Sequence, residues 1–131
     1  MGFWLFMTFC SLLLPLTFLW FGRLFIKHPP KEINSLYGYR TSMSTKNRKT
    51  WIFAHNYCGK LWWKLGLISA PITLLGMFLA YGKNFDTISA TSIGLMILQT
   101  ISIFFTIILT ERALKENFTE NGSPRYDDTD T

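Results

Sequence analysis

Residues 87–110 read TISATSIGLMILQTISIFFTIILT and contain no Asp, Glu, Lys or Arg. A transmembrane helix needs about 20 mostly apolar residues to cross about 30 Å of hydrocarbon, and this stretch of 24 residues is long enough. Backbone groups in lipid must be hydrogen-bonded within their own segment, so the expected form is a helix. The alternation of apolar and polar residues that marks a barrel strand is absent.

Two further stretches, residues 1–22 and 65–82, also lack charged side chains. Across the chain 49% of the 131 residues are hydrophobic and 16% are charged, against about 25% charged in a typical soluble domain. This composition excludes a disordered chain, and the two Cys exclude a disulfide scaffold. The sequence therefore predicts an all-α membrane protein with three transmembrane helices.

The charged segments between these stretches set the expected boundaries. We expect transmembrane helices at 1–26, 61–82 and 88–110, a basic loop at 27–60, an outer turn at 83–87 and an acidic tail at 111–131. The first stretch is expected to remain as a helix, because it lacks the basic start and the cleavage site of a signal peptide. The last dozen residues are expected to fray.

The distribution of charge predicts the orientation of the chain in the membrane. Residues 23–64 carry a net charge of +8, residues 83–86 carry none, and the tail from Glu111 onward carries −3. Loops rich in Lys and Arg stay in the cytoplasm. We therefore expect a multi-pass protein with its N-terminus outside and its C-terminus in the cytoplasm.

Part of the basic loop has the pattern of an amphipathic helix. From about Thr45, apolar residues recur at helical spacing, including Trp51, Ala54 and Cys58. We expect an interfacial helix on the inner membrane surface that continues through Gly59 into the second transmembrane helix. Its cations would bind anionic lipid head groups, and this position makes lipid a better partner than nucleic acid.

A motif within this loop resembles the SdpI family of small bacterial membrane proteins. It begins with Gly-Tyr-Arg-Thr, continues through a Ser/Thr-rich turn, and ends with a Gly-Lys pair that enters a membrane helix. The residues that carry the resemblance are Gly38, Tyr39, Arg40, Thr41, Ser44, Asn47, Thr50, Trp51, Ala54, Gly59 and Lys60. His55 departs from the pattern, because the family often has an amide side chain there.

The resemblance implies a function at the bacterial inner membrane. The family's namesake protects its host from a secreted peptide toxin that attacks the membrane, and it holds a cytoplasmic repressor at the membrane when toxin is present. The resemblance therefore implies immunity to a membrane-active peptide. The alternative is a membrane scaffold or signal transducer that recruits a cytoplasmic regulator through the basic loop.

The motif residues form the candidate site, and two interpretations remain open. Arg40, Asn47 and Trp51, with Tyr39 nearby, form a polar and aromatic site for a lipid head group, a toxin or a cytoplasmic partner. The other interpretation is structural. Ser44 caps a helix, Trp51 anchors at the interface, and Arg40 binds phosphate or pairs with Glu32 or Glu111.

Within the membrane, Gln99 is the expected polar contact between helices. No catalytic motif is present, and no cofactor is expected. His55, Cys58 and His28 lack the fourth ligand that structural zinc requires, so no metal site is predicted. A homo-oligomer remains open.

Overall fold

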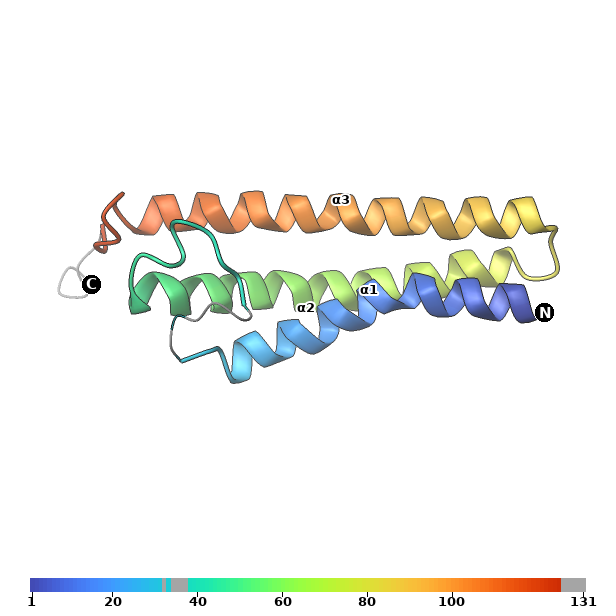
Figure 1. The fold of residues 1–131 in the computed structure, drawn as a ribbon, viewed down its shortest axis with the longest axis horizontal. Coiled ribbons are helices and arrows are strands. Elements are labelled where there is room, and N and C mark those ends of the chain that lie inside the picture. The colour runs from blue at the N-terminus through green and yellow to red at the C-terminus, as the bar shows by residue number, and fades with distance from the viewer. Residues whose placement is uncertain (32, 34–37, 126–131) are drawn as a thin grey trace.

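A computed structural model of the chain describes residues 1–31, 33 and 38–125. It contains three helices, α1 (Gly2–Lys27), α2 (Arg48–Leu79) and α3 (Phe85–Asn117), which lie along one another (Figure 1). Each is long and apolar enough to cross a membrane, and no strand occurs in the described ranges. The prediction of an all-α fold with three helices that are long and apolar enough to span a membrane is confirmed for the described residues. Residues 32 and 34–37 of the basic loop and residues 126–131 of the acidic tail lie outside the described residues.

The structure does not show the predicted interfacial helix as a separate element. Residues 48–60 are instead the first turns of α2, which continues without a break into the apolar segment (Figure 1). At about 1.5 Å per residue, its 32 residues extend well beyond the hydrocarbon thickness of the bilayer. Gly59, the expected junction, is a packing position, since a Cβ there would lie 3.0 Å from the Gly22 carbonyl oxygen of α1.

A buried polar cluster joins the three helices near mid-depth. Pro15 has no amide hydrogen, so the Ser11 carbonyl four residues earlier loses its usual helical donor. Gln99 Nε2 of α3 donates to that carbonyl over 3.1 Å and to Thr73 Oγ1 of α2 over 2.9 Å. The Ser11 and Ser92 hydroxyls add a bond of 2.6 Å between α1 and α3. Gln99 therefore satisfies a backbone group that proline leaves free.

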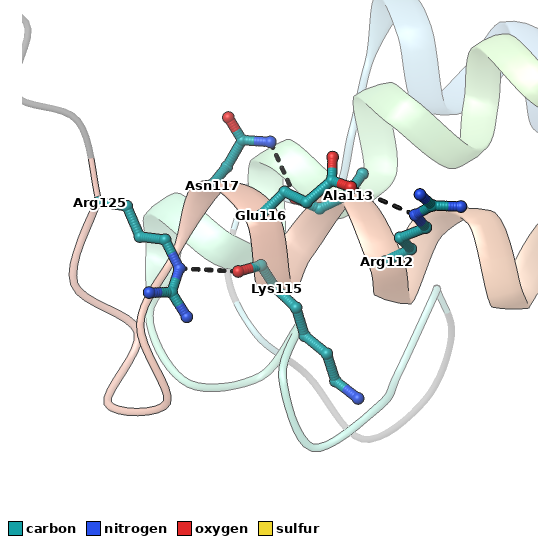
Figure 2. Close-up of polar contacts among 6 residues, drawn as sticks. All are labelled: Arg112, Ala113, Lys115, Glu116, Asn117 and Arg125. Carbon is teal, nitrogen blue, oxygen red and sulfur yellow. Dashed lines mark hydrogen bonds and ion pairs between the residues drawn. The ribbon is translucent and has the colours of Figure 1, made fainter.

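The chain after α3 folds back on the helix instead of fraying immediately. Arg125 Nε donates to the Lys115 carbonyl over 2.7 Å (Figure 2). It also donates to the Phe118 carbonyl over 3.0 Å, so both bonds satisfy oxygens near the helix end. The Arg125 backbone N–H bonds the Asn117 carbonyl. The expectation of a frayed end is thus wrong for residues 120–125, because side-chain and backbone bonds close a short turn there.

A double-mutant cycle tests the role assigned to Gln99. Gln99→Leu is expected to lower the free energy of unfolding by about 1 kcal/mol, because the Ser11 carbonyl loses its donor inside the bundle. In a Pro15→Ala background the backbone amide gained at position 15 supplies that donor, so the same substitution should cost about 0.5 kcal/mol less. Unfolding of the purified protein in mixed micelles measures both effects. Strictly additive losses would contradict the assignment.

Candidate functional site

The Gly-Tyr-Arg-Thr segment crosses the end of the bundle that carries the start of α2. We call residues 38–44 the motif loop. Gly38 has a φ of +113°, and a Cβ at this position would lie 2.6 Å from His55 Nε2. Glycine alone adopts this backbone conformation at little steric cost. Gly38 is therefore required both for the turn and for the close approach of the loop to His55.

His55 holds the motif loop through Nε2 of its ring, and its Nδ1 is bonded within α2. The Tyr39 backbone N–H donates to His55 Nε2 over 2.9 Å, and His55 Nδ1 lies 2.7 Å from the Trp51 carbonyl oxygen. An amide N–H is only a donor, so Nε2 accepts and the proton of the neutral ring resides on Nδ1. Nδ1–H then donates to Trp51. The His55 side chain is fully buried, and neither nitrogen is left to bind a metal.

Tyr39 connects the loop to α3. Its hydroxyl donates to Glu111 Oε1 over 2.8 Å, and it lies 3.3 Å from the Ile107 carbonyl oxygen. Burial, followed by the contact with Glu111, raises the pKa of Tyr39 far above its ordinary value. The phenol therefore remains protonated and acts as a donor. Glu111, one of the two acids proposed as partners of Arg40, is thus a partner of Tyr39, and the other, Glu32, lies outside the described residues.

Short-range hydrogen bonds shape the remainder of the loop. The Thr41 backbone N–H donates to Ser44 Oγ over 2.8 Å, and Ser44 Oγ also donates to the Tyr39 carbonyl. Ser44 thus closes the loop, whereas Asn47 caps α2. Asn47 Oδ1 accepts from the Thr50 N–H, and Thr50 Oγ1 accepts from the Asn47 N–H, which completes a capping box.

The Asn47 side chain and the Trp51 indole are engaged within the fold. Asn47 Nδ2 donates to the Gly122 carbonyl over 2.6 Å, which ties the tail to the start of α2. Trp51 is fully buried, and its Nε1 donates to the Pro30 carbonyl over 2.7 Å. Its ring centroid lies 4.3 Å from that of His55. Trp51 therefore supports the loop from beneath and has no surface for an external ligand or for lipid.

The four consecutive residues of the motif line a groove between α1 and α3. In Figure 1 the C-terminal half of α1 slopes away from α3, and the motif loop covers this end of the bundle. The groove has a volume of about 450 Å³, within the range of small-molecule sites. We call it the motif groove. Its walls are Thr17, Phe21, Phe25, Trp62, Ile103 and Ile107, and its polar end is Gly38, Tyr39, Arg40 and Thr41.

The structure thus separates the predicted site residues into three groups. Gly38, Tyr39, Arg40 and Thr41 meet at one groove, whereas Ser44, Asn47 and Trp51 hold the loop and the helix start. Gln99 lies apart, in the polar cluster between the helices. The sequence pattern does not identify His55 as a site residue, although it shares a helix face with Asn47 and Trp51; the pattern marks His55 only as a departure from the motif.

Comparison with known proteins gives a family match over a stretch that contains the whole motif. The model of the SdpI/YfhL protein family matches residues 31–110. The chain is also 35% identical over 87 residues to a Bacillus subtilis (strain 168) protein described as "Uncharacterized protein YfhL", covering 66% of this chain and 69% of that protein. No solved structure matches the chain.

Substitution of His55 tests whether it holds the motif loop. His55→Gln keeps one acceptor and one donor at similar reach, so we expect it to lower the free energy of unfolding by less than about 1 kcal/mol. His55→Leu leaves the buried Tyr39 N–H without an acceptor and should cost about 1–3 kcal/mol. Unfolding followed by tryptophan fluorescence measures both. Equal losses in the two variants would rule out the hydrogen-bonding role.

Proposed function

This chain belongs to the SdpI/YfhL protein family, and from that premise we propose that it confers immunity to a secreted peptide toxin that acts on bacterial membranes. The role is one of binding rather than catalysis. The observation that carries the proposal is the motif groove, because four residues of the family motif, Gly38 to Thr41, line a recess between two membrane helices.

The composition of the motif groove suits an amphipathic peptide. Phe21, Ile103 and Ile107 offer apolar walls to the side chains that a membrane-active peptide inserts into lipid. Arg40 is exposed at the polar end, where its guanidinium can bind an acidic side chain or a C-terminal carboxylate. A toxin bound in the motif groove is thereby kept from attacking the surrounding membrane.

The proposed orientation places the motif loop in the cytoplasm. The loop and the chain after α3 lie at one end of the bundle, and the N-terminus lies at the other (Figure 1). The bond between Asn47 and Gly122 joins the two segments. Because the exposed cations Lys46, Arg48 and Lys49 also lie in this region, the positive-inside rule assigns this end to the cytoplasm. A toxin would therefore reach the motif groove from within the bilayer.

Survival of toxin-exposed bacteria tests the immunity proposal. A strain sensitive to the toxin of the family's namesake should be protected by the wild-type chain. Arg40→Gln should reduce protection about tenfold, as expected when one charge-assisted hydrogen bond is lost. Lys46→Gln removes the same charge from the loop outside the groove and should protect fully. All chains are compared at equal membrane abundance.

Two results would contradict the proposal. If wild-type cells survive no better than cells with empty vector, immunity to this toxin is wrong. If Arg40→Gln and Lys46→Gln protect equally well, the motif groove is not the site.

A second candidate function is recruitment of a cytoplasmic regulator. It is favoured by the contact of the tail with the loop, since a Cβ at Gly122 would lie 2.6 Å from Asn47 Nδ2 and 2.9 Å from Lys46 Cβ. A change at Lys46 or Asn47 would therefore alter one combined surface formed by the start of α2 and the tail. The exposed residues Lys46, Arg48 and Lys49 lie beside that contact and would attract an acidic protein.

Charge neutralisation separates recruitment from immunity. Replacement of Lys46, Arg48 and Lys49 by Gln should abolish co-purification of a cytoplasmic partner while leaving toxin survival unchanged. Replacement of Lys83 by Gln, in the turn at the opposite end of the bundle, is the control. Retention of the partner by the triple variant would rule out electrostatic recruitment.

A further inference from the structure

A second groove lies along a different face of α1, beside α2. Its volume is about 760 Å³, larger than that of the motif groove. We call it the α1–α2 groove. Leu16, Trp20 and Leu24 of α1 form one wall, and Trp63 of α2 contributes the other. None of these residues belongs to the motif groove.

The α1–α2 groove changes from apolar to cationic along the helix. Leu16 marks its apolar end, and Arg23 and Lys27 mark the opposite end. From Leu16 to Lys27 the helix rises about 17 Å, at about 1.5 Å per residue. This length is close to half of the ~30 Å hydrocarbon core of a bilayer. The groove therefore matches one leaflet, with its charge at the level of the lipid head groups.

The two cations of this groove are available for an anion. Arg23 and Lys27 are four residues apart, on neighbouring turns of one helix face, and both are exposed. Within the described part of the chain, neither Arg23 nor Lys27 forms an ion pair with an acidic side chain. The ion pair found among the described residues joins Arg112 and Glu116 of α3. Like charges at this spacing repel, so an anion placed between them would relieve the repulsion.

We propose that the α1–α2 groove binds one anionic phospholipid. The phosphate lies between Arg23 and Lys27, and an acyl chain lies along Leu16, Leu24 and Trp63. The lipid comes from the leaflet on the side of the basic loop. A phospholipid of that leaflet has acyl chains as long as the groove and an anionic head group that is opposite in charge to Arg23 and Lys27. Free phosphate offers the charge but not the acyl chain. This site is independent of the toxin site proposed above.

Native mass spectrometry of the purified full-length protein tests the site. Phosphatidylglycerol and phosphatidylcholine with identical acyl chains are the probes, and glycerol phosphate is the soluble head-group control. The wild-type protein should retain one phosphatidylglycerol in preference to phosphatidylcholine and should not retain glycerol phosphate. The double substitution Arg23→Gln, Lys27→Gln should weaken phosphatidylglycerol binding about thirtyfold, given the attraction of each cation to an anionic lipid.

A matched variant separates a specific site from diffuse attraction. The double substitution Lys46→Gln, Lys49→Gln removes the same charge at the start of α2 and should leave phosphatidylglycerol binding within about twofold of wild type. Equal weakening by both pairs would overturn the proposal. Equal retention of the two lipids by the wild type, or binding of glycerol phosphate alone, would also overturn it.

A third variant tests the apolar wall of the groove. It also keeps the proposal testable if the Arg23→Gln, Lys27→Gln variant does not fold. Trp63→Ala keeps both cations but removes the wall that α2 contributes, so it should weaken phosphatidylglycerol binding at least threefold while circular dichroism shows an unchanged helix content. Unchanged binding in this variant would place the lipid outside the groove.

Discussion

The hydrogen bond from the Tyr39 backbone to His55 Nε2 holds the motif loop on the membrane helices. It joins a loop that has little regular structure to a helix that is packed on both neighbours. The left-handed conformation of Gly38 brings the Tyr39 N–H to the ring, and the Trp51 carbonyl fixes the proton on Nδ1. With the loop held in this way, Arg40 and Thr41 lie at the end of the motif groove.

The same requirement, that buried backbone groups find partners, organises the bundle at mid-depth. Pro15 frees a carbonyl in α1, and Gln99 of α3 bonds both that carbonyl and a hydroxyl of α2. Toward the motif loop, Trp62 Nε1 donates to Thr106 Oγ1 and joins α2 to α3. These bonds hold α3 to α1 and α2 at two different levels along the bundle. Toward the motif loop, α1 diverges from α3, and the motif groove lies between them.

The sequence predicts the three spans because the cost of burying charge in lipid is large and leaves three uncharged stretches. The helical pattern from about Thr45 indicates a helix that continues into the second span, but not that residues 48–60 are part of the packed bundle. Gly59 is expected as a junction, yet it contacts Gly22 of α1, and close contact between helices is not visible in a local pattern. Trp51 resembles an interfacial anchor but is buried under the loop. The importance of His55 follows from a bond across 16 positions in the chain, which helical spacing alone does not predict. The amide side chain that the family resemblance leads us to expect at this position can also donate and accept, so His55 can fill the same role.

Nitrogen-15 NMR of His55 in the protein reconstituted in lipid tests this account most directly. Assignment uses a His28→Gln background, so that His55 is the sole histidine. We expect at neutral pH a neutral ring with its proton on Nδ1 and a hydrogen-bonded acceptor at Nε2, with a coupling to the Tyr39 amide. A proton on Nε2, or a ring charged at neutral pH, would contradict the account, because the Tyr39 N–H would then have no acceptor and the motif loop no attachment to α2.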